Sequence, residues 1–250
     1  QETEDTAVWC SPDLVNWRLL PGAKWHPRPP DPPAFVFWNA KVGKYIITTR
    51  PEWPDRRLAL VETGNWREFT EPRLVLHADA DDRPLAQLYG MYVKPYAGYY
   101  VGFAWVFYAG SATDRRPPHR YRGGRVETYL CYSLDGLYWQ RCKHEPLFRN
   151  GTAGAVDAGC LQVSNLIQLE NGSLRAYAAC SRSEHGICPA DDGYITAYAL
   201  RRDGFVCLAS GGETGNVCTK ALYWRGGEAS LNVAASGGVV QVRVREARGK

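Results

Sequence analysis

The chain has 250 residues, of which 45% are hydrophobic and 22% charged, and 30 basic against 26 acidic residues give a formal net charge of +4. This length and composition indicate a folded protein with an ample core and exclude a disordered chain. The basic residues are spread along the sequence, which argues against a nucleic-acid partner, and no apolar run approaches the ~20 residues that a membrane-spanning helix needs.

Three segments predict β-hairpins. In chain order, the first is FVFWNAKVGKYIITT, residues 35–49, around a Lys-Val-Gly-Lys turn. YGMYVKPYAGYYVGFAWVF, residues 89–107, repeats this form around Pro-Tyr-Ala-Gly. LQVSNLIQLENGSLRAYAAC, residues 161–180, repeats it around Glu-Asn-Gly, and Asn-Gly is the strongest tight-turn signal of the three. No long helix is expected, because apolar positions rarely recur at three-to-four spacing.

A corner with the pattern Ser-x-Asp-x-x-x-Trp occurs in residues 11–17 and again in residues 133–139. We expect a weaker copy after the first hairpin, with Glu62 in the Asp place and Trp66 in the Trp place. The Asp is expected to accept backbone N–H bonds across the turn between two outer strands. The Trp is expected to pack between neighbouring sheets. The repeat unit is therefore hairpin, strand, corner, strand.

The third hairpin is followed by a faint copy of the corner at Asp203 and Phe205. Four-strand units of this length are typical of propeller blades. The sequence predicts an all-β protein with about three and a half β-propeller blades in residues 1–206. A small β-sandwich module is expected in residues 207–250, where Gly-Gly turns separate strands. Since such a number of blades cannot close a ring, the rest are absent or come from another chain or from self-association.

Eight cysteines leave two interpretations open. No CxxC pair occurs, which argues against a zinc ribbon. Three pairs could each close a hairpin with a disulfide: Cys131/Cys142, Cys180/Cys188 and Cys207/Cys218. Cys131 and Cys207, which have apolar neighbours, could equally be buried free thiols. The sequence therefore does not decide between the cytoplasm and an extracellular or periplasmic location, which would follow removal of a leader. The extracellular or periplasmic location is favoured.

Four segments carry a resemblance to a known family: SPDLVNW, DPPAFVFWNAKVGKYI, YSLDGLYWQR with GTAGAVDAG behind it, and LRRDGFVCLASGGETGNVCTKALYWRGGEASLNVAAS. They resemble the propeller glycoside hydrolases of families 32, 43 and 68, over nearly the whole chain. The resemblance implies a five-bladed propeller with a carboxylate-lined funnel at its axis. The blade that usually opens the family, and carries its first catalytic Asp, is not evident in this sequence.

Cleavage of a glycosidic bond needs one carboxylic acid to protonate the leaving oxygen and a second carboxylate to activate water or attack carbon. Side chains meet at a propeller axis from the start of each innermost strand, which selects Asp31, Gln87 and Asp157. Asp31 resembles the family's Asp-Pro step, which supplies the base or tunes the pKa of the acid. The alternative interpretation of Asp31 is an ordinary turn residue in RPPDPPA. Asp157 could likewise be a turn residue at the start of a strand. Gln87 stands where the family often has its acidic Glu, and an amide cannot donate that proton.

The acid must then come from elsewhere, and Glu127 and Glu184 are the candidates. SRSEHG, which contains Arg182, Glu184 and His185, suits recognition of sugar hydroxyls or carboxylates, although a surface loop is the competing interpretation. The predicted catalytic residues are Asp31, Asp157, Glu127 and Glu184. The predicted substrate-binding residues are Arg50, Trp53, Gln87, Tyr89, Arg182 and His185, with Trp53 able to stack on a sugar face.

No cofactor or metal site is predicted. Asp79, Asp81 and Asp82 in HADADDRP lack the spacing and glycine of a calcium loop, so a solvated loop is expected there. The sequence favours a glycoside hydrolase acting on a furanosidic or related plant or bacterial glycan. Two alternatives remain: a non-catalytic carbohydrate-binding propeller, and a sialidase-like enzyme, whose Asp-box the corner resembles. The expected partner is an oligosaccharide or polysaccharide, with no nucleic acid and no membrane.

Overall fold

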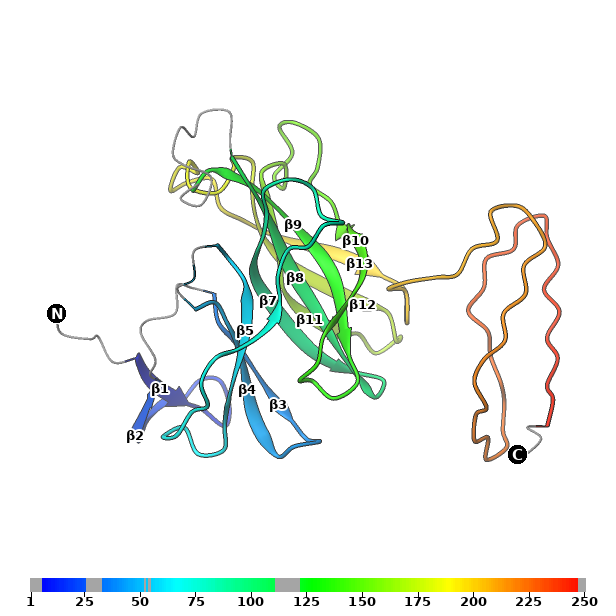
Figure 1. Ribbon diagram of the computed structural model, residues 1–250, viewed down its shortest axis with the longest axis horizontal. Coiled ribbons are helices and arrows are strands. Elements are labelled where there is room, and N and C mark those ends of the chain that lie inside the picture. The colour runs from blue at the N-terminus through cyan, green and yellow to red at the C-terminus, as the bar shows by residue number, and fades with distance from the viewer. Residues whose placement is uncertain (1–5, 26–32, 52, 54, 111–121, 247–250) are drawn as a thin grey trace. The chain divides into compact units, whose positions relative to one another are not determined.

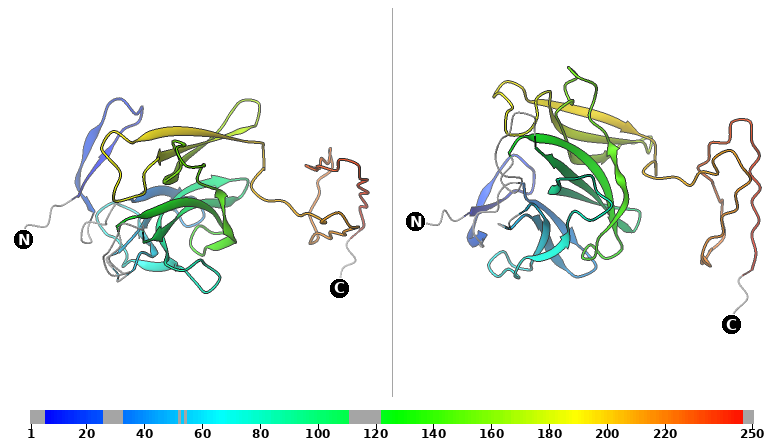
Figure 2. Two further views of the ribbon diagram at one scale, coloured as in Figure 1. Left: turned by 90° about the horizontal axis from the view of Figure 1, so that it is seen from above. Right: turned by 45° about the horizontal axis from the view of Figure 1, so that its top comes forward.

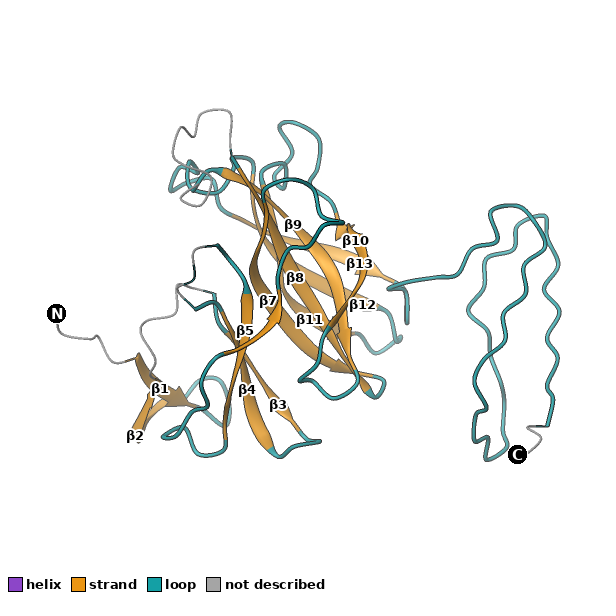
Figure 3. Cartoon of the chain, viewed as in Figure 1, coloured by secondary structure: helices purple, strands orange, loops and turns teal. Residues whose placement is uncertain are grey.

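The computed structural model describes residues 6–25, 33–51, 53, 55–110 and 122–246. Packing of the Cα atoms divides the chain into two units, residues 1–206 and 207–250. All strands of the described residues lie in the first unit (Figure 1). The described part of the chain contains no helix (Figure 3), and hence none that could span a membrane.

The three predicted hairpins are confirmed. β3 (Phe35–Asn39) pairs antiparallel with β4 (Lys44–Thr49), β7 (Ala86–Tyr96) with β8 (Tyr99–Ala109), and β11 (Cys160–Gln168) with β12 (Leu174–Ser181). Each turn has glycine with positive φ, at Gly43, Gly98 and Gly172, a conformation that costs glycine little. Alternation of apolar residues and local turn chemistry were therefore sufficient to place these elements.

The remaining strands flank the corners. β1 (Thr6–Cys10) pairs with β2 (Arg18–Trp25), β5 (Leu58–Thr63) with β6 (Arg73–Leu76), and β9 (Gly124–Ser133) with β10 (Gln140–Phe148). β13 (Tyr194–Leu200) pairs with β12. Among described residues, hairpin, strand, corner and strand thus occur in full twice, as β3–β6 and β7–β10. β11–β13 has three strands and is joined to β9 by one parallel pair, Cys160 with Val126.

The β3–β6 sheet packs against the seven-stranded sheet that contains β7–β13, and Figure 2 gives two further views of the chain. One core cluster joins Phe37 and Ile46 of the β3–β6 sheet to Leu88 and Met91 of the next sheet. Another joins Phe103 of β8 to the strands of the third hairpin. The predicted all-β class is thus confirmed for the described residues, and the division into propeller blades stays a prediction.

The corners work as expected through their carboxylates. Asp13 Oδ1 accepts the backbone N–H groups of Val15 and Asn16 at 2.9 and 2.7 Å. Asp135 Oδ1 accepts those of Leu137 and Tyr138, both at 2.8 Å. Each carboxylate therefore satisfies two backbone donors that the turn leaves without a ladder partner.

The expected positions of the corner after the first hairpin are wrong by a few residues. Thr63 and Asn65, not Glu62, accept the turn N–H groups, and Phe69 stands in the Trp place. Trp66 is instead a left-handed turn residue with φ of 59°. The short Thr and Asn side chains reach the turn backbone, whereas Glu62 forms an ion pair with Lys44 at 3.2 Å.

The corner tryptophans differ from each other. Trp139 is buried against Gly102, where an added Cβ would lie 2.7 Å from its ring, so it packs as predicted. Trp17 is 53% exposed, and the prediction that it packs between sheets is wrong for the described residues. At the third copy, Asp203 accepts a hydrogen bond from Tyr96 Oη at 2.6 Å, and Phe205 packs against the same ring.

The second unit has no strand in its described residues, 207–246, and all of them are exposed. The β-sandwich module therefore stays a prediction. All eight cysteines are free thiols. Burial raises the pKa of Cys131 to about 12, so this thiol stays protonated. Cys207, expected to be buried on the free-thiol interpretation, is exposed because its apolar neighbours belong to an unpacked segment.

Candidate functional site

One group of cationic and aromatic side chains gathers where several strands of the first unit begin or end. We call it the Tyr89 cluster, and it consists of Arg50, Arg56, Gln87, Tyr89, Phe107 and His185. Arg50 follows β4 and Arg56 precedes β5, while the residue pair Gln87 and Phe107 joins β7 to β8. His185 comes from the segment after β12. The cluster is therefore built from segments far apart in sequence.

Tyr89 is the centre of this group. The guanidinium carbon of Arg50 lies 4.4 Å from the centre of its ring, and that of Arg56 lies 5.6 Å away. Arg56 also lies 4.6 Å from the ring centre of Phe107. Cations at such distances are attracted by the negative face of an aromatic ring. Arg50 itself is only 3% exposed, so this charge lies at the rim of the core.

His185 is held in one orientation by three contacts. Its Nε2 lies 2.8 Å from Tyr89 Oη, and its Nδ1 lies 2.8 Å from the carbonyl oxygen of Arg122. Its backbone N–H donates to the carbonyl of Gly124 at 2.9 Å. Because a carbonyl only accepts, Nδ1 carries the proton in neutral His185, and Nε2 accepts from the Tyr89 hydroxyl. The imidazole is therefore fixed as an acceptor towards the cluster.

Gln87 is buried and accepts a hydrogen bond from Arg56 through its side-chain oxygen at 2.8 Å. An amide in this position stays neutral and cannot supply a proton to a leaving group. Its part in the cluster is to orient Arg56.

Two glutamates are the predicted acids, and of these only Glu184 adjoins the cluster along the chain. Glu184 precedes His185 and forms an ion pair with Arg125 at 3.6 Å. Glu127 accepts the backbone N–H of Asn150 at 3.3 Å through Oε1. In each, Oε2 is buried and has no hydrogen-bond partner among the described residues. A buried carboxylate oxygen without a partner is costly, and such groups point to a ligand or to a bound proton.

The two glutamates face different surroundings. Phe107 opposes Val126, and both belong to the cluster of apolar side chains on which Tyr89 packs. Glu127, one residue on, opposes Val106 and so lies on the other face of β9. Glu184 is tied to the Tyr89 cluster more directly, through its chain neighbour His185.

Asp157 is half-buried and accepts a hydrogen bond from Tyr198 Oη at 2.6 Å. Burial, followed by this bond to a carboxylate, raises the pKa of Tyr198. Asn150 connects Asp157 to β9, because its Nδ2 donates to the backbone carbonyls of Val126 and Asp157. A Cβ on Gly151 would meet Asp157 Oδ1 at 2.3 Å, so glycine is needed for this close approach.

The structure thus brings together four predicted binding residues, Arg50, Gln87, Tyr89 and His185. It places Arg182 apart from them, with Nε donating to the Gly154 carbonyl and the guanidinium 4.5 Å from the ring centre of Tyr194. The backbone N–H of Trp53 donates to the Pro51 carbonyl. Asp31 lies outside the described residues. Sequence reasoning missed Arg56, Phe107, Asn150 and Tyr198, and no local motif distinguishes them.

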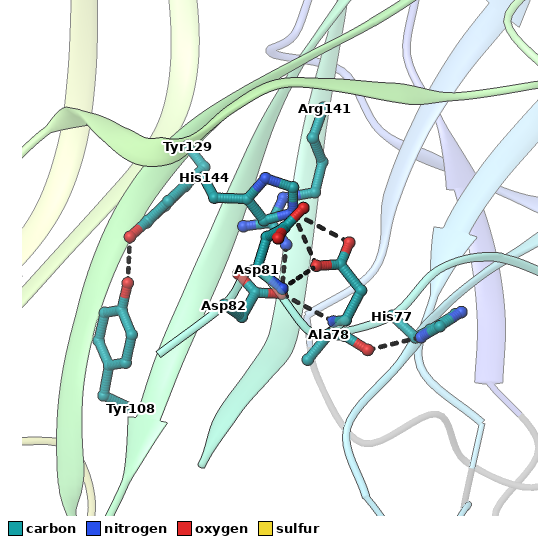
Figure 4. A network of polar contacts seen from close by, with 9 residues as sticks. His77, Ala78, Asp81, Asp82, Tyr108, Tyr129, Arg141 and His144 are labelled. Atoms are coloured by element: carbon teal, nitrogen blue, oxygen red, sulfur yellow. Dashed lines mark hydrogen bonds and ion pairs between the residues drawn. The ribbon is translucent and has the colours of Figure 1, made fainter. Parts of the chain in front are cut away.

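A second polar network lies between the loop before β7 and strand β10 (Figure 4). Arg141 Nη1 donates to Asp82 Oδ2 at 2.6 Å, with both side chains at most 5% exposed. His144 pairs with Asp79 at 2.9 Å. The hydrogen bond from His144 is the main cause that lowers the pKa of Asp79. Figure 4 also shows the hydroxyl contact between Tyr108 and Tyr129.

This network corrects the expectation of a simple solvated loop, because Asp82 is buried and paired. Donor atoms of Asp79, Asp81 and His144 lie within 4.8 Å of one another, a set that could ligate a cation. In the structure, the Asp79 carboxylate already accepts from His144 and from the Asp81 backbone N–H. These contacts account for the geometry of the loop.

Comparison with known proteins gives structural matches only. No family model matches the chain, and no curated protein matches it. The solved endo-arabinase from Bacteroides thetaiotaomicron is 14% identical, with a TM-score of 0.48 over 68% of this chain and 50% of that one. A thermostable family-43 glycoside hydrolase is 13% identical, with a TM-score of 0.46 over 71% and 50%.

The Bombyx mori β-fructofuranosidase of family 32 is 11% identical, with a TM-score of 0.45 over 63% of this chain and 30% of that one. The chain therefore spans half or less of the length of these solved structures. The matches concern the path of the backbone, and no residue role transfers at these identities.

Proposed function

We propose that this chain is part of a glycoside hydrolase that cleaves a furanosidic or related glycan linkage. The observation that carries the proposal is the buried Oε2 of Glu184, which has no hydrogen-bond partner among the described residues and belongs to the chain neighbour of His185 in the Tyr89 cluster. Hydrolysis of a glycosidic bond requires a protonated carboxyl group and a second carboxylate within one site. An aromatic ring can stack on the apolar face of a sugar, and arginines beside the ring can donate hydrogen bonds to the sugar hydroxyls.

In this proposal Glu184 is the general acid, and Glu127 is the alternative. Glu184 is preferred because its neighbour His185 contacts Tyr89, whereas Glu127 points to the other face of β9. Asp157 and Asp31 are the candidate facing carboxylates. Tyr89 and Arg50 would hold the sugar, and Gln87 would keep Arg56 in position.

The test is release of sugar from a panel of oligosaccharides and plant or bacterial polysaccharides, followed by chromatography. A defined released sugar would establish hydrolysis and the substrate class. Asp31→Asn, Asp157→Asn and Glu184→Gln should then abolish turnover while the far-ultraviolet circular dichroism stays unchanged. Full activity in all three variants would remove this site from consideration.

A non-catalytic carbohydrate-binding propeller is the second candidate. The buried amide of Gln87, hydrogen-bonded to Arg56, favours it, because an amide at the head of an inner strand supports binding without proton transfer. Saturable glycan binding without sugar release would select this function. Sialosides belong in the panel, because Arg50 and Arg56 both approach the Tyr89 ring and arginines bind sugar carboxylates. Release of sialic acid alone would select the sialidase-like alternative.

A further inference from the structure

A cavity of about 280 Å³ lies at the opposite end of the strands that carry the Tyr89 cluster. β7 begins near Tyr89 and reaches the cavity with Lys94 and Tyr96. A strand rises about 3.3 Å per residue, so Lys94 lies roughly 16 Å along β7 from Tyr89. β12 begins at the cavity with Leu174 and ends shortly before His185. The cavity is therefore separate from the candidate site for hydrolysis.

The floor of this cavity is apolar and belongs to the packed core. Leu166 of β11 and Leu174 of β12 line it, and they are 1% and 0% exposed. Both are members of the core cluster that joins β8 to the third hairpin, so the cavity lies where that core ends. Pockets for small molecules have volumes of roughly 300–1,000 Å³. A cavity just below this range suits a ligand with one ring, whose apolar face would cover the two leucines.

The charged side chains around this floor give it a net positive charge. Lys94, Arg202 and Asp203 contribute two cations and one anion, a sum of +1. Asp203 is already engaged, because Oδ1 accepts from Tyr96 Oη at 2.6 Å and Oδ2 lies 3.8 Å from Nε of Arg202. Lys94 is half-buried, and its ammonium group has no hydrogen bond or ion pair among the described residues. A ligand with a carboxylate would supply the missing partner of Lys94.

Gln168 adds a neutral hydrogen-bonding group at the rim. It lies two residues beyond Leu166 on β11 and hence on the same face of that strand. Its amide lines the cavity, is exposed, and has no hydrogen-bond partner in the part of the chain that the structure describes. A side-chain amide can donate to one hydroxyl of a sugar and accept from another.

We propose that this cavity binds a single sugar ring that bears a carboxylate, a hexuronate, at a site distinct from the Tyr89 cluster. Lys94 pairs with the carboxylate, Gln168 binds ring hydroxyls, and the apolar face of the ring covers Leu166 and Leu174. The choice of a sugar rests on the proposed function, whereas the cavity and its charge do not depend on it. An acidic polysaccharide bound here stays close to the Tyr89 cluster of the same unit.

The test follows the amide NMR spectrum of the full chain during titration with sodium D-glucuronate and, separately, sodium D-galacturonate. For at least one of them we expect saturable shifts at the amides of Lys94, Tyr96 and Gln168, with an affinity in the millimolar range. D-glucose, sodium acetate and inorganic phosphate are the comparison ligands, and each should bind at least tenfold more weakly. No saturation by either uronate up to about 50 mM overturns the proposal.

Two variants locate the bound carboxylate. Lys94→Met keeps the apolar stem of the side chain and removes its charge, and it should weaken uronate binding at least tenfold. Gln168→Glu places a second carboxylate beside the ligand and should have the same effect. Lys143→Met makes the same change in net charge at an exposed position of β10 and should bind as the wild type does. The amide spectra themselves show whether each variant is folded.

A tenfold loss in both variants, with selectivity for a uronate, supports the proposal. Unchanged binding in both variants overturns the site, as do shifts confined to Tyr89 and His185. Equal affinity for D-glucose overturns the role of the carboxylate, and equal affinity for acetate or phosphate overturns the sugar ring. Because binding is measured without turnover, a failure of the proposed hydrolysis, seen as absent sugar release, is distinguished from a failure of this inference.

Discussion

Tyr89 Oη lies 2.8 Å from Nε2 of His185, although 96 residues separate the two in sequence. This bond joins β7 to the segment after β12, and in it the hydroxyl of Tyr89 donates to His185. Removing the hydroxyl keeps the ring that Arg50 and Arg56 approach. Tyr89→Phe therefore separates hydrogen bonding from ring contact.

We expect Tyr89→Phe to weaken glycan binding about fivefold to tenfold, since one hydrogen bond contributes about 1 kcal/mol. Isothermal titration with a glycan identified from the panel measures this. Tyr99→Phe is the matched control, because Tyr99 is 49% exposed and stands in the same hairpin. Equal affinities for the two variants would contradict a role of the Tyr89–His185 bond in binding.

Glu184→Gln should lower kcat at least a hundredfold while KM changes little, because the amide keeps the shape of the side chain and loses the transferable proton. Glu127→Gln tests the alternative acid in the same assay. Glu170→Gln, in an exposed turn, serves as the control. A loss in Glu127→Gln with full activity in Glu184→Gln would reverse the assignment of the acid.

Gly102→Ala should destabilise the first unit by about 1–3 kcal/mol, because the new Cβ meets the buried ring of Trp139. Gly64→Ala should have almost no effect, since no atom lies within 4 Å of the place that its new Cβ would take. Urea unfolding followed by circular dichroism compares the two. Similar midpoints would mean that the Trp139 contact relaxes without cost.

Asp82→Ala should destabilise the protein by about 3 kcal/mol, because Arg141 would be left buried without its carboxylate. Glu145→Gln breaks the exposed pairs with Lys143 and Arg149 and should leave the unfolding temperature almost unchanged. Thermal unfolding of both variants gives the comparison. A small loss in Asp82→Ala would show that water reaches the guanidinium.

Stability should depend on Asp79 in acid. Its pKa is lowered in the folded protein, chiefly by the hydrogen bond from His144, so its contribution is present above the unfolded pKa of about 3.9. It is lost as the pH falls through the lower folded pKa. The difference in unfolding free energy between wild type and Asp79→Asn should therefore shrink below about pH 4 in urea titrations. A constant difference between neutral pH and strong acid would rule out this linkage.

The sequence by itself determined the hairpins and the carboxylate corners. Both depend on neighbours within a few residues: alternating apolar positions, glycine at the turns, and a short Asp side chain that reaches its own backbone, as Asp135 does. The corner after the first hairpin departs from the Ser-x-Asp-x-x-x-Trp pattern, and its residues were assigned wrongly. Glu62 and Trp66 were placed in the corner roles that Asn65 and Phe69 hold, because short polar side chains other than Asp also accept the turn N–H groups.

Only the tertiary structure decided which distant residues meet. The side chains of Arg56, Tyr89 and His185 converge because three separate strand ends lie together, and no sequence spacing encodes that distance. The burial of Asp82 likewise depends on Arg141, 59 residues away. Local pattern specifies a strand and its turn, whereas packing of one sheet on the next sets which charges are paired and which carboxylate oxygens are left without a partner.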